Sequence, residues 1–424
     1  MKVLVAGASG LIGSAVVARL LADGHQVVAL ARRLAHLPRH PRLHRIGADL
    51  SGWTTPAHWQ AALRGVDAVL NAVGIFREQG RQRFQALHVE MPCALFMACE
   101  RAGVRRVVQV SALGAGPDAA TAYWRSKGLA DQALRASTLD WLIVQPSLVY
   151  APAGRSAALF RRLAALPLLP VPAGAGHVRP IYLDDVVALL RHALDPHCPG
   201  RRAVAAVGPV RLGHAGWLGA LRRGMGMRPA RVLRVPGWLA GAAAALLGRF
   251  PGSLVDRDSL VMLHSDNSAS PHAAAALAGR PLRDPGRFAT PAERLPALLH
   301  WHLWVARMVI AAVWLATAYV CFADLDAGTG LLRDAGLPLA WRAPLVWLGG
   351  GLDLALGVLV LWRPTRAVWA AQAALVLGYT ALITWLLPVW WRHPFGPVLK
   401  NLPMLAWFAL FLQLDRHAQI EEQA

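Results

Sequence analysis

The chain has 424 residues, of which 55% are hydrophobic and 16% are charged, with 44 Lys and Arg against 24 Asp and Glu. Its mean hydropathy of +0.38 and net charge of +20 exclude a disordered or fibrous protein. The length predicts two or three domains.

The charge and the tryptophans are distributed unevenly along the chain. Residues 1–299 hold 36 of the basic and 17 of the acidic residues, whereas residues 300–424 hold 11 of the 17 Trp. The basic surface is explained either by solvated arginines or by attraction to anionic lipid headgroups. Because no basic-aromatic motif and no metal-ligand cluster occur in the sequence, we predict no nucleic-acid partner and no metal site.

The chain begins with the pattern of a strand, a glycine turn and a helix. Lys2–Ala6 is a short apolar run, the glycine-rich segment Gly7–Gly13 follows, and Ser14–Ala22 has helical periodicity. Glycines permit the sharp turn and let the backbone approach a pyrophosphate, which rests on the helix N-terminus. We therefore predict a nucleotide-binding site that includes Gly7, Ser9, Gly10, Leu11, Ile12 and Gly13.

The second predicted strand bears on the choice of cofactor. Gln26–Ala31 ends at Arg32 and Arg33, without the acidic residue that would hydrogen-bond a ribose 2′-hydroxyl. Arginines at this point suit a 2′-phosphate, so NADP(H) is favoured and NAD(H) is the alternative. Two solvated arginines are the other interpretation of the pair.

The third and fourth predicted strands lead to further cofactor contacts. A strand near Ile46–Ala48 ends at Asp49 and Leu50, which we expect beside an adenine ring, and a strand over Asp67–Val73 runs into Gly74. We expect the second strand end to pass over the cofactor with Asn71, Ala72, Val73 and Gly74. Asn71 is otherwise only a polar residue at a strand end.

The fifth predicted strand introduces the candidate catalytic residues. Val104–Val110 ends at Ser111, and Tyr123 and Lys127 begin a helix that runs through Leu134. Residues four apart share a helix face, so we expect the ammonium of Lys127 to lower the pKa of the Tyr123 phenol and to reach a cofactor ribose. Ser111 can then bind a substrate oxygen while Tyr123 transfers a proton as hydride moves.

Over about residues 1–295 the chain resembles the short-chain dehydrogenase/reductase superfamily, in particular its extended and atypical branch. The matching segments are Gly7–Gly13, Asp49–Leu50, Val110–Gly114, Tyr123–Lys127, Gln145–Tyr150 and Pro180–Val186. The resemblance implies Tyr123 as general acid/base, Lys127 as its partner and ribose ligand, and Ser111 as substrate orienter. Pro146 completes the predicted cofactor contacts. The chain is also similar to the reductase-like accessory subunit of respiratory complex I, which holds NADPH without known turnover.

Three positions depart from that family pattern. His88 stands where relatives often have Asn, Asp131 replaces Glu four residues after the lysine, and Ala151 replaces a glycine. These departures concern the proton relay more than cofactor binding.

The segment after Ser147 should form a smaller substrate lobe, so that residues 1–296 make one NAD(P)-binding domain with residues 147–296 as its lobe. Within the lobe, Pro236–Leu247 is apolar but too short to span a membrane. It can lie in the membrane surface, line the substrate pocket or be a core helix, and the core helix is favoured.

Residues 300–424 are predicted to form an all-α, four-helix transmembrane domain. Apolar stretches of 17 to 20 residues occur at Val305–Phe322, Leu345–Trp362, Val368–Leu387 and Val398–Leu414, with Trp residues near their ends. A buried soluble bundle is the alternative. Arg307 and Asp353 lie inside these stretches and can form an ion pair, unless Arg307 extends its guanidinium to the interface.

The short loops predict the orientation. The very short loop after the second stretch contains Arg363 and Arg366 within five residues. The loop after the first contains Asp324, Asp326, Arg333, Asp334 and Arg342. The positive-inside rule therefore places the N-terminal domain and the C-terminus in the cytoplasm and the helices in the inner (plasma) membrane.

His393–Leu405 resembles the last-helix signature of DoxX-like membrane proteins, a resemblance that covers roughly residues 300–415. Some members of that family are linked to quinone-coupled redox chemistry, whereas many have no known role. The resemblance therefore implies a location in the membrane more than a reaction.

The sequence thus predicts an α/β Rossmann-type, doubly wound parallel sheet with a small substrate lobe, followed by the transmembrane domain. The predicted function is a membrane-anchored NAD(P)H-dependent oxidoreductase of the short-chain dehydrogenase/reductase type. Its partners would be the lipid bilayer and a hydrophobic carbonyl, alcohol or quinone-like substrate at the cytoplasmic membrane face. The alternative is a non-catalytic NADPH-binding sensor or assembly subunit of a membrane (respiratory) complex. A third hypothesis makes the membrane domain itself a quinone-linked redox or transport module.

Overall fold

The computed structural model describes residues 1–250, 253, 255–394 and 396–423, with side chains up to residue 414. The chain divides into two compact units, Met1–Leu298 and Leu299–Ala424. The boundary falls within one long helix, α10 (Arg294–Ala323).

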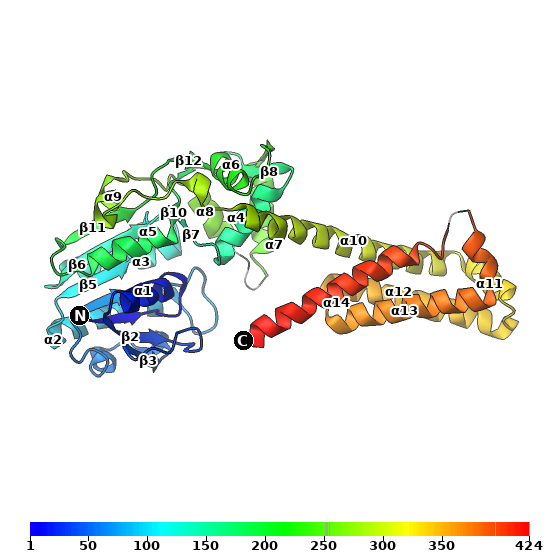
Figure 1. The fold of residues 1–424 in the computed structure, drawn as a ribbon, viewed down its shortest axis with the longest axis horizontal. Coiled ribbons are helices and arrows are strands. Elements are labelled where there is room, and N and C mark those ends of the chain that lie inside the picture. Colours follow the sequence, from blue (N-terminus) through cyan, green and yellow to red (C-terminus); the bar gives the residue numbers. More distant parts are fainter. Residues whose placement is uncertain (251–252, 254, 395, 424) are drawn as a thin grey trace. The chain divides into compact units, whose positions relative to one another are not determined.

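The first unit is built on a parallel sheet. Its strands are β1 (Lys2–Ala6), β2 (Gln26–Ala31), β3 (Leu43–Gly47), β4 (Ala68–Asn71), β5 (Arg106–Val110), β6 (Asp140–Pro146) and β11 (Arg202–Ala206). They lie in the order β11-β6-β5-β4-β1-β2-β3 (Figure 1). The strand order reverses between β1 and β4, and in such sheets ligands bind at the carboxyl ends of the strands at this point. The predicted doubly wound parallel sheet is confirmed.

Helices cover both faces of the sheet. They are α1 (Leu11–Ala22), α2 (Met91–Ala102), α3 (Ala122–Ala136), α5 (Leu183–Ala193) and α9 (His272–Ala278). Val3 and Val5 of β1 pack with α1, α5 and α9, whereas Leu4 and Ala6 pack on the other face with α2 and α3. Successive strand residues point to opposite faces, so a strand buried on both faces is apolar throughout.

Short irregular turns complete this unit. They are 3₁₀ turns at Leu50–Gly52, Pro56–Trp59, Pro285–Arg287 and Pro291–Glu293, and a turn of π-helix at Gln85–Glu90. The π-helical turn leads directly into α2.

Residues after β6 form most of a smaller lobe. Its elements are β7 (Val149–Tyr150), α4 (Arg155–Ala165), β8 (Leu168–Pro172), β9 (His177–Val178), β10 (Ile181–Tyr182), β12 (Leu212–Gly213), α6 (His214–Gly224), β13 (Arg231–Val235), α7 (Gly237–Leu247) and α8 (Arg257–His264). Strands pair as β7 with β10, β9 with β12 and β8 with β13. Aromatic rings fill the lobe's core, with Phe288 at 5.3 Å from Tyr150 and 5.8 Å from Trp217 between ring centroids.

Helix α7 is not the core helix that the sequence favoured. Only Ala240 and Ala244 of this helix are buried. Trp238 is 75% exposed and Leu246 55% exposed. Because alanines are the residues that face the protein, the helix buries little apolar surface and presents its large side chains outward.

The second unit is helical. It contains most of α10, together with α11 (Leu325–Asp334), α12 (Leu339–Trp362), α13 (Arg366–Leu386), a 3₁₀ turn at Pro388–Arg392 and α14 (Asn401–Gln423). Among the residues that the structure describes, three helical segments are long and apolar enough to cross a membrane, namely Pro291–Ala323, α12 and α13. In the core of the unit, Trp369 stacks on Phe411 with their ring centroids 4.1 Å apart.

The fourth predicted span differs from the structure. We expected Val398–Leu414, but α14 begins at Asn401 and its apolar part is Asn401–Leu414. Gly396 has φ +53°, and the turn from Gly396 to Lys400 delays the start of the helix. The apolar part is therefore shorter than the ~20 residues that a span needs. Phe395, within the segment that resembles DoxX-like proteins, lies outside the described residues.

Arg307 and Asp353 do not form the ion pair that the sequence suggested. The guanidinium of Arg307 donates hydrogen bonds to the carbonyls of Val360 and Leu361 near the end of α12. Asp353 is 4% exposed, and its Oδ1 has no hydrogen-bond partner among the described residues. Seven residues of helix separate Val360 from Asp353, about 10 Å along the axis, so Arg307 binds too far away.

Candidate active site

The glycine turn after β1 is shaped by close backbone contacts. Gly7 has φ +79°, and a Cβ there would lie 2.9 Å from the backbone of Ala72. A Cβ on Gly13 would lie 2.2 Å from the carbonyl oxygen of Gly7. Only glycine fits both positions, which explains why the turn carries this sequence.

The helix that follows can bind an anion. Gly10 is the N-cap of α1 and supplies no side chain to cap the first turn. The first N–H groups of a helix have no partner within the helix, and they carry the positive end of its dipole. The residues predicted here, including the partly exposed Ser9, Leu11 and Ile12, therefore fit a pyrophosphate.

The candidate adenosine end lies beyond β2 and β3. Arg32 and Arg33 are exposed immediately after β2. Asp49 accepts hydrogen bonds from Ser51 and from the side-chain amide of Gln82, 3.1 Å away. Burial raises the pKa of Asp49, but the hydrogen bonds and the charge of Arg32 more than offset it, so the net shift is downward. Leu50 is 5% exposed, and its side chain belongs to the core.

Asn71 does not present its side chain to a ligand. It is fully buried, and its Nδ2 donates to Oε1 of Gln109 over 2.8 Å. Its Oδ1 accepts a hydrogen bond from the backbone N–H of Val73. The amide therefore holds the end of β4, and contacts to a cofactor there would come from the backbone of Ala72–Gly74.

Lys127 on α3 lies at the carboxyl ends of two neighbouring strands. Its Nζ donates to the carbonyl of Val73, at 2.9 Å, and to the carbonyl of Val110, at 3.1 Å. A Cβ on Gly74 would lie 3.4 Å from this nitrogen. Burial lowers the pKa of Lys127 to about 8, against the opposing charge of Asp131. The ammonium therefore lies buried at the carboxyl ends of β4 and β5, beside Gly74.

Ser111, directly after β5, binds a carboxylate within the protein. Its hydroxyl donates to Oδ2 of Asp131 over 2.6 Å, and Gln145 donates to the same oxygen over 3.2 Å. Ser111 and Asp131 are 4% and 1% exposed. The hydroxyl therefore has a lone pair but no free proton to offer a substrate in this arrangement.

Tyr123 lies in an aromatic setting rather than beside the ammonium of Lys127. Its ring centroid lies 5.1 Å from that of Phe76 and 5.8 Å from that of His88. Burial raises the pKa of Tyr123 to about 12, which reverses the lowering that we expected from Lys127. The reason is that Lys127 donates instead to two backbone carbonyls.

His88 organises this part of the site, a role that the sequence did not predict. Its Nε2 accepts a hydrogen bond of 3.0 Å from the N–H of Ile75, so Nδ1 carries the proton and donates to Oγ of Ser126 over 2.9 Å. Ser126 donates in turn to the carbonyl of Tyr123. Burial, with a smaller effect of the charge of Lys127, lowers the pKa of His88 to about 2 and keeps the ring neutral.

The loops after β5 and β6 are joined beside these residues. Pro146 is buried at the end of β6, and its carbonyl accepts a hydrogen bond from the N–H of Leu113. Asn267 accepts from Ser147 over 2.6 Å and donates to the carbonyl of Leu113 over 3.1 Å. Asn267 was not among the predicted site residues, because its partners are remote in sequence.

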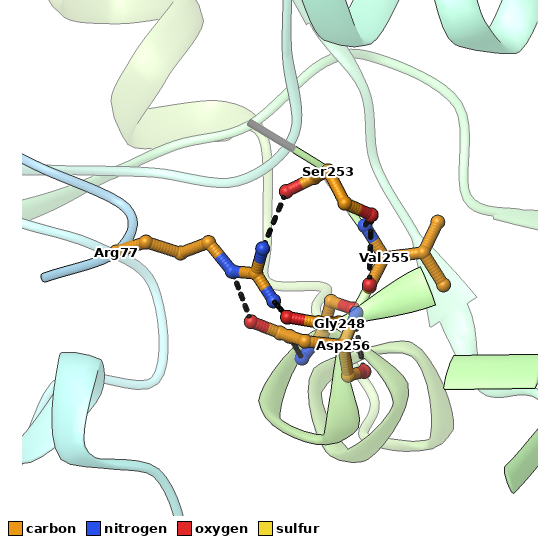
Figure 2. A network of polar contacts seen from close by, with 6 residues as sticks. Arg77, Gly248, Ser253, Val255 and Asp256 are labelled. Atoms are coloured by element: carbon orange, nitrogen blue, oxygen red, sulfur yellow. Dashed lines mark hydrogen bonds and ion pairs between the residues drawn. The ribbon is translucent and has the colours of Figure 1, made fainter. Parts of the chain in front are cut away.

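A second contact links the segment after β4 to the lobe. Figure 2 shows Arg77 reaching Asp256, Gly248 and Ser253. Its Nε lies 2.6 Å from Oδ2 of Asp256, and its Nη1 donates to the carbonyl of Ser253 over 2.9 Å. Arg77 also lines a pocket of about 400 Å³ together with Ala244 and Gly248. Since Phe76 contacts Tyr123, this contact lies next to the candidate proton donor.

The structure thus brings Ser111 and Lys127 to the carboxyl ends of β4 and β5, and the glycine turn follows β1 in the same sheet. Tyr123 contacts Phe76, in the segment that follows β4. The structure leaves the side chains of Leu50 and Asn71 inside the protein. A buried lysine and a glycine turn before a helix N-terminus therefore lie where the strand order reverses, the place at which such sheets bind ligands.

Comparisons with known proteins agree with this arrangement. Residues 7–161 match the NAD(P)H-binding family, and residues 311–409 match the DoxX-like family. The chain is 30% identical over 261 residues to the NAD(P)H azoreductase of Xenophilus azovorans, an alignment that covers 60% of this chain and 84% of that protein. These matches confirm the predicted combination of an NAD(P)H-binding domain with a DoxX-like domain.

Two further likenesses have narrower meaning. The mouse mitochondrial NADH dehydrogenase [ubiquinone] 1 alpha subcomplex subunit 9 is 30% identical over 220 residues, which cover 49% of this chain and 56% of the subunit. The structure of UDP-glucuronic acid 4-epimerase from Bacillus cereus with UDP-glucuronic acid and NAD has a TM-score of 0.52 and 15% identity. The alignment with the epimerase covers 70% of this chain and 100% of the epimerase chain. At this identity the likeness shows the fold alone.

Proposed function

The chain belongs to the family of NAD(P)H-binding oxidoreductases that includes the azoreductase of Xenophilus azovorans. We propose that it reduces a substrate, and that this substrate is soluble in lipid. The oxidoreductase is fused to a DoxX-like membrane domain. The proposed reaction is of the short-chain dehydrogenase/reductase type, on a hydrophobic carbonyl or quinone-like compound. The observation that supports the proposal is the position of the Lys127 ammonium at the carboxyl ends of β4 and β5, where Gly7 of the glycine turn comes close to Ala72. Tyr123 precedes Lys127 by one helical turn on α3.

The proposed cofactor is NADPH. The backbone of Gly7–Gly13 would hold its pyrophosphate, and Lys127 would hold the ribose nearest the reacting ring. Arg32 and Arg33 would bind the 2′-phosphate, because both are exposed beyond β2. When bound, this cofactor supplies the hydride.

Tyr123 is the proposed proton donor. Because the pKa of Tyr123 is about 12, the phenol is protonated at neutral pH and can give its proton to the oxygen of a carbonyl whose carbon accepts hydride. Hydride and proton together convert a carbonyl to an alcohol. The raised pKa of Tyr123 therefore favours reduction of a carbonyl over oxidation of an alcohol. Ser111 would accept a hydrogen bond from the product hydroxyl, since its own proton is donated to Asp131.

The proposed location is the inner membrane, with residues 1–296 and the C-terminus in the cytoplasm and residues 300–424 as the membrane domain. Arg363 follows α12 and Arg366 begins α13, whereas Asp324, Asp326, Arg333 and Asp334 lie in and before α11, and this difference in charge supports the orientation. A tether to the bilayer favours substrates that partition into lipid, such as a quinone.

The test uses the full chain purified in detergent. We expect NADPH emission to report binding, and a short-chain quinone or an aldehyde to oxidise the bound NADPH. Tyr123→Phe should retain NADPH binding and lose most of the oxidation, since general acid catalysis typically contributes ~10²–10⁴-fold. Tyr319→Phe is the matched control, because Tyr319 is 72% exposed on α10 and remote in sequence from the site.

The similarity to the mouse complex I subunit favours one alternative, a non-catalytic NADPH-binding subunit of a membrane complex. Tight NADPH binding without oxidation by any quinone, aldehyde or azo compound tested would support this alternative. Failure to bind either NADPH or NADH would contradict both functions.

A further inference from the structure

Helix α7 exposes all of its large apolar side chains to a substantial degree. Its sequence, GWLAGAAAALL, contains no charged residue, and only Ala240 and Ala244 are buried. Trp238, Leu246 and Leu247 are 75%, 55% and 43% exposed. Soluble surfaces seldom present a continuous apolar segment of this kind unless it binds something.

The exposed apolar surface extends to both sides of α7. In β13, Val232 is 46% and Leu233 50% exposed, although they lie on opposite faces of the strand. Phe250, beyond the end of the helix, is 59% exposed. We call residues 231–250 the apolar segment.

Four exposed arginines lie in or next to the apolar segment. Arg228 precedes it, Arg231 and Arg234 lie in β13, and Arg249 follows α7, and all four are exposed. None of the four has an acidic partner among the residues that the structure describes. Cationic side chains beside an apolar surface match the anionic headgroups and acyl chains of a phospholipid layer.

We propose that the apolar segment lies in the headgroup region of an anionic bilayer, with α7 parallel to the membrane plane. Eleven helical residues extend about 16 Å, half of the ~30 Å hydrocarbon core, so α7 cannot cross it. A bilayer is the chosen occupant because three helices among the described residues are able to span one and because the exposed charge in and beside the segment is mainly positive. The pocket beside α7 also contains Asp258, so the excess of arginines, and not the absence of acidic residues, is the argument.

The segment is connected to the candidate site through Arg77. Gly248, directly after α7, accepts a hydrogen bond from Arg77, which also pairs with Asp256 (Figure 2). The pocket that Arg77 lines is bounded by Ala244 and Ala245 of α7. If the proposed reduction holds, a lipid-soluble substrate would approach the protein at this membrane surface. The lipid contact itself does not depend on that reaction.

The experiment measures the depth of a spin label in the full chain, reconstituted into vesicles of phosphatidylcholine with or without phosphatidylglycerol. The label is attached at Leu246→Cys, in a chain whose four native cysteines are replaced by alanine. Met97→Cys is the matched control, because Met97 is also an exposed apolar helix residue, 43% exposed on α2. NADPH binding checks that both labelled proteins are folded.

The measured quantity is the ratio of the label's collision rate with oxygen to its collision rate with a water-soluble nickel chelate. We expect this ratio to be several-fold higher at position 246 than at position 97. The difference should grow with phosphatidylglycerol. Replacing Arg231, Arg234 and Arg249 together by Gln should remove this dependence on anionic lipid. Equal collision ratios at the two positions, or a label at 246 that reaches neither oxygen nor nickel, would overturn the proposal. Because no turnover is measured, loss of reductase activity cannot be mistaken for loss of lipid binding.

Discussion

Asp131 accepts a 2.6 Å hydrogen bond from the hydroxyl of Ser111 and lies one helical turn after Lys127 on α3. One buried carboxylate therefore orients the serine and raises the pKa of the lysine, whose own burial acts in the opposite direction. Changing this residue should alter both neighbours without touching a ligand.

Asp131→Asn should shift the pH dependence of NADPH binding. Lys127 is protonated below its pKa of about 8, so binding should weaken as the pH rises through that value. Without the carboxylate this pKa falls further, and the midpoint should move to lower pH. NADPH titrations across pH about 6–10 measure it. Asp118→Asn, at an exposed position, is the control. An unchanged midpoint would show that Lys127 does not govern binding.

His88 should make the protein sensitive to acid. Its pKa is about 2 when folded and 6.5 ordinarily, so the unfolded state binds more protons between these values. The contribution of the neutral His88 ring to the free energy of unfolding is therefore fully present above pH ~6.5. It decreases as the pH falls, by about 2 kcal/mol at pH ~5. His88→Asn keeps a hydrogen-bond acceptor for the N–H of Ile75 but cannot be protonated in this range. We expect this variant to lose much less unfolding free energy between neutral pH and pH ~5. Urea unfolding at each pH, monitored by NADPH binding, measures the difference.

The exposed His36 supplies the control for that experiment. His36→Asn should leave the acid sensitivity as it is in the unaltered chain. If His88→Asn retained the full loss between neutral and acidic pH, another group would be responsible.

Gly128→Ala should be far more damaging than Gly116→Ala. A Cβ on Gly128 would lie 2.3 Å from the backbone of Gly116, whereas a Cβ on Gly116 meets nothing within 4 Å. The first substitution must displace the loop that leads to Tyr123, at a cost of about 1–3 kcal/mol or more. The second should stay within ~0.5 kcal/mol. Urea unfolding of both variants gives the comparison, and equal stabilities would mean that the loop moves freely.

Arg32→Ala should weaken NADPH binding by about 10-fold or more and leave NADH binding nearly unchanged, because only NADPH has the 2′-phosphate. Arg39→Ala removes an exposed arginine from the same loop and should change neither. Parallel titrations with both nucleotides measure the effect. A similar loss for both cofactors would contradict a 2′-phosphate contact at Arg32.

Local patterns in the sequence predicted much of the first unit. The apolar run Lys2–Ala6 and the run Gln26–Ala31 are strands at those bounds, and the helix expected over Tyr123–Leu134 is present as α3. These elements can be predicted from local sequence, because glycine turns and hydrophobic periodicity depend only on residues a few positions apart. The prediction of a parallel sheet followed by a helical membrane region is confirmed, with three helices meeting the requirements of a span.

Contacts between distant residues explain what sequence alone did not predict. His88 binds Ile75 and Ser126, which are 13 and 38 positions away, and no local pattern connects them. Lys127 was expected to act on Tyr123, but the carbonyls at the ends of β4 and β5 compete for its ammonium. Asn71 was expected to contact the cofactor, but its side-chain amide donates a hydrogen bond to Gln109 on the adjacent strand β5.

The order of strands along the chain has a consequence for how the protein is made. The last strand of the parallel sheet, β11, ends at Ala206, and the first helix able to span a membrane begins at Pro291. At ~5–20 residues per second, the ribosome needs several seconds to synthesise the intervening segment. The sheet can therefore close before any span emerges, and the insertion machinery receives a nascent chain that already carries a finished domain. Substitutions that slow closure of the sheet should then appear in cells as failed membrane insertion.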